Sequence, residues 1–436
     1  MLRNLFAALA LVAALVTGGP VRAEGAADQV LATWYKLTLE LIRHTPTYTP
    51  PVASRALAYL GVAGFEATAS GPGDLQSLAG QLQGLTPLPP REAGLAYDEA
   101  AVLEAALADV VRGLFANTGP SGQRSMKAVA RSLDALTADG LDADTLDRSR
   151  AYGQAVARHI LAWSGADGGA VVENMGFPMT YTLIAEPGHW VPTNKVVQQQ
   201  APLLPGWGNN RPFAMPDGAT CDLPPPPAYS EDPASEFYAE AKATHDAVVN
   251  RTRDQTAIAR FWSDDAMLSV TPPGHWISIA LLVMDTQAAD IGRRTEVLAV
   301  LGVAVADAFI GCWNQKYRYD VIRPITYIRK VIDPTWEPLL NTPPFPEYPS
   351  GHSTQSAAAA VVLTALFGPA VAFEDNTGGA DGLAPRSFPS FWAAAEEAGM
   401  SRLYGGIHYP IAIENGLAQG RCIGAYAAAL QTRKSP

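Results

Sequence analysis

The segment that decides the fold reads Pro-Pro-Phe-Pro-Glu-Tyr-Pro-Ser-Gly-His-Ser-Thr-Gln and covers residues 343–355. Its four prolines predict extended backbone, because proline fixes φ and disfavours helical geometry in the residue before it. Ser350 then stands where a helix N-cap is expected, ahead of the apolar run 357–367. The first turn of a helix has unpaired N–H groups and a partial positive charge, so Ser350, Gly351 and His352 form a candidate anion site. A capped core helix with an incidental histidine is the alternative.

Two basic residues precede this segment on a helix that is predicted to begin near residue 295. Lys316 and Arg323 are seven residues apart, which places both side chains on one helix face, about 10.5 Å apart along the axis. Pro324 is expected to end that helix directly after Arg323. Two long cationic side chains on one face are able to converge on a small oxyanion. A solvated basic stripe is the alternative, because further basic residues follow.

A second candidate histidine lies near the C-terminus, in Ser-Arg-Leu-Tyr-Gly-Gly-Ile-His-Tyr-Pro, residues 401–410. The two glycines are expected to end the preceding helix, and Pro410 suits the first turn of the last one. His408 is therefore predicted at a helix start and Arg402 at a helix end. A core histidine in a tight loop is the alternative.

Three motifs now stand in order along the chain: Lys316-x6-Arg323-Pro324, Pro349-Ser350-Gly351-His352 and Ser401-Arg402-x5-His408. Together they resemble the signature of the vanadium-dependent haloperoxidases, and of the bacterial exported type in particular. This family shares its fold with the type 2 phosphatidic acid phosphatases. The resemblance implies an all-α fold of two helical bundles with the oxyanion site in the C-terminal bundle, and vanadate as the cofactor.

The resemblance also implies a role for each residue of the basic cluster. Lys316, Arg323 and Arg402 resemble the three groups that hold the equatorial oxygens of vanadate, where fixed positive charges stabilise an oxyanion without reorganising. Lys316 is further expected to polarise bound peroxide. Ser350 and the Gly351 amide resemble hydrogen-bond donors to the same anion.

The two histidines and the residues around them are assigned in the same way. His408 resembles the imidazole that binds vanadium, and His352 resembles the acid–base histidine on the opposite side of the anion. Trp313 and Phe345 match positions that line the pocket. Asp265 is the first candidate for the carboxylate that braces the second arginine of the cluster, and the preceding aspartate is the next candidate.

The function implied by the resemblance is oxidation of a halide by hydrogen peroxide to hypohalous acid, which then halogenates a small organic acceptor. Phe345 resembles the aromatic residue of chloroperoxidases, where many bromoperoxidases have histidine, but this residue alone does not determine the halide. An acid phosphatase with a phospho-histidine at His408 is the alternative, with His352 protonating the leaving oxygen. An oxyanion-binding protein without turnover is less favoured, because binding requires neither histidine.

The chain of 436 residues is expected to divide into four parts. Residues 1–23 have a basic start, a short apolar run and a small-residue cleavage site, which indicate a signal peptide and an exported protein. Residues 24–187 are predicted to form an N-terminal helical bundle, and residues 233–436 a C-terminal bundle that contains the site. Residues 188–232 form a connecting loop rich in proline, glycine and tryptophan.

Composition limits the partners of this protein. The formal net charge of −11 argues against binding to nucleic acid or to anionic membranes. No stretch after the signal is judged long and apolar enough to span a membrane. The sequence leaves a homo-oligomer open.

Three cysteines are too few for a disulfide-rich scaffold. Cys312 and Cys422 lie in apolar helical stretches and are expected to be buried free thiols. One bridge, which would involve two of Cys221, Cys312 and Cys422, is the alternative.

Overall fold

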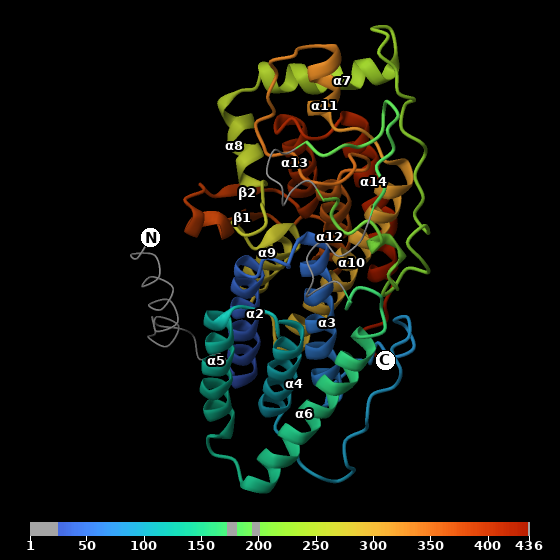
Figure 1. The fold of residues 1–436 in the computed structure, drawn as a ribbon. Coiled ribbons are helices and arrows are strands. Elements are labelled where there is room, and N and C mark those ends of the chain that lie inside the picture. Colours follow the sequence, from blue (N-terminus) through green and yellow to red (C-terminus); the bar gives the residue numbers. More distant parts are fainter. Residues whose placement is uncertain (1–24, 172–180, 194–200, 435–436) are drawn as a thin grey trace.

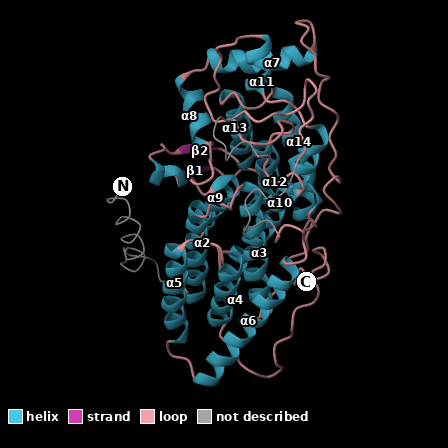
Figure 2. Ribbon diagram, in the orientation of Figure 1, coloured by secondary structure: helices cyan, strands magenta, loops and turns pink. Residues whose placement is uncertain are grey.

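The computed structural model describes residues 25–171, 181–193 and 201–434, and over these residues the chain is mostly helical. Figure 2 shows helices throughout and a single small pair of strands. The all-α prediction is therefore confirmed. The predicted signal peptide, residues 1–23, lies outside the described residues.

The N-terminal half forms a bundle at the lower end of the molecule in Figure 1. Its helices are α2 (Ala26–His44), α3 (Pro50–Ala69), α4 (Glu99–Leu114), α5 (Pro120–Ala138) and α6 (Ala143–Ser164). Local sequence explains where they begin. Proline occupies the first turn of α3 and of α5, while Asp98 and Asp142 accept backbone N–H groups at the starts of α4 and α6.

The C-terminal half contains the remaining helices and the only strands of the described chain. Its helices are α7 (Glu236–Val249), α8 (Arg253–Phe261), α9 (Thr271–Thr286), α10 (Ile291–Tyr319), α11 (Pro324–Val331), α12 (Gly351–Phe367), α13 (Phe391–Tyr404) and α14 (Pro410–Ala428). Between α12 and α13 lie the 3-10 helix η3 (Thr377–Asp381) and the antiparallel strands β1 (Phe373–Asp375) and β2 (Arg386–Phe388). The two phenylalanines Phe373 and Phe388 are partners in this pair.

Helix α10 runs through the middle of the molecule (Figure 1). It packs most extensively against α3 of the first bundle and also contacts α12 and α14, so helices of both halves contribute to one core. The crossing with α3 is close, because a Cβ atom on Gly61 would lie 2.6 Å from the carbonyl oxygen of Leu298. Any larger residue at this position would push the two helices apart.

Among the described helices, α10 alone is long and apolar enough to cross a membrane, and its apolar stretch is fully buried inside the protein. This finding corrects the expectation that no stretch after the signal has such length and hydropathy. An apolar surface on all sides is also what a helix in the centre of a large core requires.

The described parts of the connecting segment, residues 188–193 and 201–232, include a stretch that packs against α10. It contains the short 3-10 helix η2 (Trp207–Asn209). The carboxylate of Asp307, which is buried in α10, accepts three consecutive backbone N–H groups from residues 213–215, at 2.6, 2.8 and 3.0 Å. These bonds hold the segment in place without regular secondary structure.

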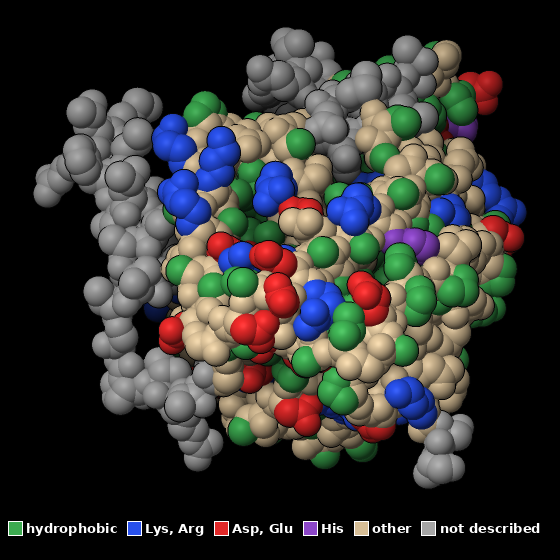
Figure 3. Space-filling model, turned by 90° about the horizontal axis from the view of Figure 1, so that it is seen from below, with side chains coloured by type: hydrophobic (Ala, Val, Ile, Leu, Met, Phe, Trp, Pro, Cys, Tyr) green, Lys and Arg blue, Asp and Glu red, His purple; other side chains and the backbone are tan. Residues whose placement is uncertain are grey.

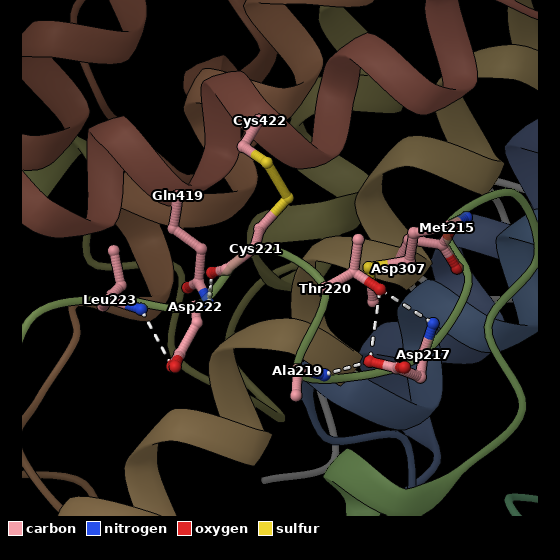
Figure 4. Close-up of a disulfide and its surroundings, with 10 residues drawn as sticks. All are labelled: Met215, Asp217, Ala219, Thr220, Cys221, Asp222, Leu223, Asp307, Gln419 and Cys422. Carbon is pink, nitrogen blue, oxygen red and sulfur yellow. Dashed lines mark hydrogen bonds between the residues drawn. A yellow bond between two sulfur atoms is a disulfide. The ribbon is translucent and has the colours of Figure 1, made fainter.

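A disulfide joins the same segment to the last helix (Figure 4). Cys221 is bonded to Cys422 of α14, 201 residues further along the chain, and Gln419 donates a hydrogen bond to the carbonyl of Cys221 at 3.3 Å. The expectation of a free thiol at Cys422 is therefore wrong, whereas Cys312 is a buried free thiol as predicted. Helical periodicity identifies a face of α14 but not the loop that packs on it.

Figure 3 shows the end of the molecule that lies at the bottom of Figure 1. Basic and acidic side chains are interspersed on this face, with small apolar patches between them. This face is therefore not continuously acidic, although the formal net charge of the chain is −11.

Candidate active site

The start of α12 has the geometry that its sequence predicts. Ser350 is the N-cap, and its Oγ accepts hydrogen bonds from the Ser353 backbone N–H at 3.3 Å and from Ser353 Oγ at 2.9 Å. The hydroxyl hydrogen of Ser350 remains available for donation. The Gly351 amide belongs to the first turn, which has no acceptor within the helix. This helix start therefore offers donors to an anion.

Lys316 lies in the last turn of α10 and is fully buried. Its ammonium donates to the carbonyl oxygens of Pro346 at 2.9 Å, Glu347 at 2.9 Å and Pro349 at 2.5 Å. These three bonds use all three ammonium hydrogens and tie α10 to the proline-rich segment. Burial lowers the pKa of Lys316 to about 7.

Arg323 does not lie on the same helix as Lys316, so that prediction is wrong. Helix α10 ends at Tyr319, Asp320 has the left-handed φ of 51°, and Arg323 is the N-cap of the next helix, α11. The physical reason is that Pro324 occupies the first turn of α11, where proline is favoured, and so begins a helix rather than ending one. The turn between α10 and α11, rather than the spacing along one helix, brings Lys316 and Arg323 together.

The guanidinium of Arg323 faces His408. Its Nε donates to the Phe345 carbonyl at 2.8 Å, and its Nη1 donates to the Ile407 carbonyl at 2.9 Å and lies 3.3 Å from His408 Nε2. Its Nη2 has no hydrogen-bond partner among the described residues. Burial lowers the pKa of Arg323 to about 10.

His408 is buried in the turn before α14. Its Nδ1 lies 2.7 Å from Oε1 of Glu347, and the same oxygen accepts the Tyr409 backbone N–H at 2.9 Å. Burial, together with the positive charges of Arg323 and Lys316, holds the pKa of His408 well below its usual range. The ring is therefore neutral at neutral pH.

Arg402 and His352 meet at one backbone carbonyl. Arg402, in the last turn of α13, donates from Nη2 to the carbonyl of Trp262 at 2.5 Å, and His352 also hydrogen-bonds the Trp262 backbone. Burial, followed by the charges of Arg402 and His275, holds the pKa of His352 well below its usual range. The Nε2 atom of His352 has no partner among the described residues.

The structure does not pair the predicted carboxylate, Asp265, directly with Arg402. Asp265 lies close enough for the charge of Arg402 to lower its pKa, although burial outweighs this effect and raises the pKa overall. No ion pair shorter than 4.0 Å joins Asp265 to Arg402 within the described chain, and Asp264 instead pairs with His275 at 3.0 Å. Arg402 is held mainly by backbone carbonyls, including that of Ala259 at 3.4 Å.

Two aromatic rings cover the cations. Phe345 lies 4.9 Å from Trp313 between ring centroids, and the charged groups of Lys316 and Arg323 lie 5.0 and 4.9 Å from the Phe345 centroid. A Cβ atom on Gly351 would lie 3.7 Å from the Trp313 ring, which places the start of α12 beside the same rings. The structure thus brings the predicted pocket residues together with the cations.

The assembled residues fit a multiply charged oxyanion. Arg323, Lys316, Arg402 and His352 all act on the pKa of His408, so the five groups share one buried environment. Buried positive charge is costly unless it is paired, and the unpartnered Nη2 of Arg323 and Nε2 of His352 are donor or acceptor atoms that a bound anion would satisfy. Vanadate and phosphate both have the charge and the oxygen atoms that such a set requires.

The sequence reasoning missed two contributors to the site. Glu347 lies inside the proline-rich segment, and an acidic residue between two prolines of an apolar stretch was the available signal. The carbonyl of Trp262 left no signal, because a backbone atom is selected by the fold alone.

Known proteins are similar to this chain in both sequence and structure. A family model described as the VCPO second helical-bundle domain matches residues 296–434. The vanadium chloroperoxidase of Curvularia inaequalis is 32% identical in an alignment of 132 residues, and the match covers 24% of this chain and 21% of that protein. The sequence similarity to that relative thus covers about a fifth of its length.

Solved structures extend the similarity over the whole chain. A structure described as the first bacterial vanadium-dependent iodoperoxidase has a TM-score of 0.87 and 36% identity, and the match covers 96% of this chain and 100% of that one. A bacterial vanadium-dependent chloroperoxidase in its holo form has a TM-score of 0.66 and 16% identity over 95% of this chain and 94% of its own, a likeness of fold. With whole-chain similarity at 36% identity, the protein belongs to the vanadium-dependent haloperoxidase family, and it is an enzyme of that family with vanadate as the implied cofactor.

Proposed function

We propose that this enzyme oxidises iodide, and bromide more slowly, with hydrogen peroxide at the site between α10, α12 and α14. The reaction consumes one halide ion, one peroxide molecule and one proton, and yields hypohalous acid and water. The observation that carries the proposal is the meeting of two neutral imidazoles, the partly buried His352 and the buried His408, with the buried cations Lys316, Arg323 and Arg402. A site for oxyanion binding alone would require only the cations.

Residues of this chain would hold vanadate as follows. His408 presents Nε2 to vanadium, while Arg323, Arg402 and the donors at Ser350 and Gly351 bind its oxygens. When bound, vanadate supplies Lewis-acid chemistry that activates peroxide. The cations are fixed by backbone carbonyls before the anion binds, which avoids reorganisation during the reaction.

Lys316 contributes to this site differently from the arginines. Its three hydrogens are donated to carbonyls of the proline-rich segment, so its contribution is positive charge and the shape of that segment. The proposed polarisation of peroxide by Lys316 therefore acts through charge, or follows exchange of one carbonyl bond for a bond to the bound anion.

His352 moves the proton that the reaction requires. Its unpartnered Nε2 is buried, and the ring is neutral near pH 7 because burial and the charge of Arg402 disfavour the imidazolium. A neutral imidazole is able to accept a proton from hydrogen peroxide and to return it to a leaving oxygen.

The choice of iodide rests on the whole-chain relative that is described as an iodoperoxidase, at 36% identity. The aromatic residue Phe345 resembles chloroperoxidases instead, and the chloroperoxidase of Curvularia inaequalis is 32% identical, but that similarity covers only 24% of this chain. Turnover with iodide, bromide and chloride at equal concentration tests this choice. Faster turnover of chloride than of iodide would reverse it.

The activity itself is tested with purified protein, orthovanadate, hydrogen peroxide and each halide, with halogenation of a phenolic dye as the readout. Hydrolysis of p-nitrophenyl phosphate is measured in parallel, because the phosphatase alternative uses the same residues. We expect vanadate to activate halogenation and to inhibit any phosphate release. Rapid phosphate release with no halogenation by any halide would contradict the proposal.

We also propose that the protein is exported. Support comes from the signal-like residues 1–23 and from the Cys221–Cys422 disulfide, because disulfides persist in oxidising compartments. The intact mass of protein recovered outside the cytoplasm is expected to correspond to a chain that starts at Glu24. A full-length mass in the cytoplasmic fraction alone would refute export.

A further inference from the structure

A buried carboxylate lies directly behind the histidine that is assigned to vanadium. Glu347 is fully buried in the segment before α12, and its Oε1 lies 2.7 Å from Nδ1 of His408 in the turn before α14. The same Oε1 accepts the Tyr409 backbone N–H at 2.9 Å, while Oε2 has no partner among the described residues. The two side chains come from positions 61 residues apart, so the fold has brought them together.

These contacts determine which nitrogen of His408 carries the hydrogen. When Glu347 is ionised, Oε1 has no hydrogen of its own, so it accepts both the Tyr409 backbone N–H and a hydrogen from Nδ1 of His408. On the other side of the ring, Arg323 Nη1 lies 3.3 Å from Nε2, and a guanidinium is also only a donor. Both neighbours therefore favour the same tautomer, with the lone pair on Nε2, and the 2.7 Å contact with Glu347 is the shorter of the two.

We propose that Glu347 is the positioning residue that holds His408 in the Nδ1–H tautomer and strengthens Nε2 as a donor to the oxyanion cofactor. A carboxylate that accepts a hydrogen bond from the distal nitrogen of a metal-binding imidazole orients the ring and raises its basicity. Low local polarity strengthens this bond, because both side chains are buried. The inference rests on the proposed role of His408.

Several hydrogen bonds to Glu347 fix the orientation of the His408 ring. Glu347 is held by the Tyr409 N–H on its side-chain oxygen and by two backbone bonds, from its N–H to the Val321 carbonyl at 2.9 Å and from Lys316 to its own carbonyl at 2.9 Å. The carboxylate therefore cannot rotate away from His408 without breaking a bond to the adjacent residue. Nε2 is the ring nitrogen left to face the cations.

The first test reads the tautomer directly in the protein without cofactor. Nitrogen NMR of histidine-labelled full-length protein distinguishes a ring nitrogen that carries hydrogen from one with a lone pair, and the spectrum of a His408→Gln variant assigns the signals of His408. We expect wild type to show a hydrogen-bonded hydrogen on Nδ1, and Glu347→Ala to lose that hydrogen-bond shift and to show some hydrogen on Nε2, because only the longer 3.3 Å contact with Arg323 then opposes it. An unchanged His408 spectrum in Glu347→Ala would overturn the proposal.

The second test measures anion affinity with orthovanadate and, separately, orthophosphate by equilibrium dialysis at fixed pH. Loss of the partner behind a metal-binding histidine typically weakens binding about 10–100-fold, and we expect this loss for Glu347→Ala. Glu347→Gln keeps the shape and an acceptor oxygen but not the charge, so it should retain the Nδ1–H tautomer and show a smaller loss. If Glu347→Ala fails to fold, Glu347→Gln decides, and wild-type affinity in that variant would overturn the proposal.

Glu240→Gln is the matched control. Glu240 is a half-buried carboxylate that accepts the Ile411 backbone N–H at 2.9 Å, at the start of the same helix α14, without contact to an imidazole. Glu240→Gln should leave the tautomer and both affinities unchanged, and an equal loss in this control would reduce Glu347 to a structural role and overturn the proposal. If wild type binds neither anion, the proposed function fails, and the tautomer measurement still decides the role of Glu347.

Discussion

At the scale of single residues, the site is a set of buried charges that are held by backbone atoms. Lys316 and Arg323 have no exposed surface, and Arg402 is 2% exposed. Their hydrogen bonds are mostly to carbonyl oxygens, which stabilise positive charge without neutralising it. Net positive charge therefore remains for an anion.

Substitutions of the two histidines are expected to affect anion binding and turnover differently. His408→Ala should abolish both orthovanadate binding and halogenation, because it removes the atom assigned to vanadium. His352→Ala should keep orthovanadate binding within a few-fold but reduce turnover by about 10²–10⁴-fold, the usual contribution of a general acid–base group. Equilibrium dialysis and the halogenation assay measure the two effects.

His44→Ala is the control for both variants, because His44 is an exposed residue at the end of α2. Its affinity and turnover should equal those of wild type. Full turnover in His408→Ala would remove the assignment of the vanadium ligand, and full turnover in His352→Ala would remove the proton-transfer role.

At the scale of elements, α14 lies against α12 so closely that only glycine fits at the contact. A Cβ atom on Gly420 would lie 2.1 Å from the Thr354 carbonyl oxygen and 2.7 Å from Ala357 Cβ. This contact matters for the site because Ser350 caps α12 and His408 lies just before α14.

Gly420→Ala should lower the free energy of unfolding by about 1–3 kcal/mol, because overpacking outweighs the ~1 kcal/mol gain in helix propensity. Gly292→Ala in α10 is the matched control, since the nearest atom to its added Cβ would be 3.5 Å away. Urea denaturation measures both changes. Equal stability of the two variants would show that α12 and α14 are able to separate without cost.

The loop behind His352 is anchored by a buried triad. His275 of α9 lies 3.0 Å from Asp264 and 2.9 Å from Asp375, and its ring stacks on Trp262 at 4.7 Å between centroids. Burial opposes the charged form, but Asp264 and Asp375 outweigh it and raise the pKa of His275 to about 10. The triad thus fixes the residue whose carbonyl receives Arg402.

The contribution of His275 to stability is expected to depend on pH. Because its pKa is raised in the folded state, the stabilisation is complete below the unfolded pKa of 6.5 and is lost as the pH rises through about 10. His275→Gln should therefore lower the free energy of unfolding most below pH 6.5, by about 3–5 kcal/mol, and less near pH 10. Urea denaturation across this range measures the gap, and a constant gap would contradict a charged triad.

At the scale of the whole molecule, α10 and the Cys221–Cys422 disulfide connect parts that are distant in sequence. The helix joins the two halves through a common core, and the disulfide ties the connecting segment to α14, 201 positions further along the chain. The site lies among these elements and depends on their relative placement.

Reduction of the disulfide should lower the free energy of unfolding by about 2–5 kcal/mol, because the unfolded chain gains conformational freedom. Thermal and urea unfolding with and without a strong reductant measure the change. The double variant Cys221→Ala/Cys422→Ala should show the lower stability under both conditions. An effect of reductant on this variant would point to Cys312 instead.

Much of this architecture was predictable because it depends on neighbours in sequence. The Ser350 cap, the helix starts at prolines and the apolar runs are local features, and they predicted most helices within a few residues. The break between Lys316 and Arg323 was missed because proline at a first helical turn and proline at a helix end look alike in sequence.

By itself, the sequence determined the types of residue at the site, the order of the motifs and the all-α class, since these follow from local propensity and from residue chemistry. The tertiary structure alone decided that Glu347 supports His408, that the Trp262 carbonyl receives Arg402, and that Cys221 pairs with Cys422. Each of these contacts joins segments at least 61 residues apart. Such contacts result from the packing of whole helices, which no short stretch of sequence encodes.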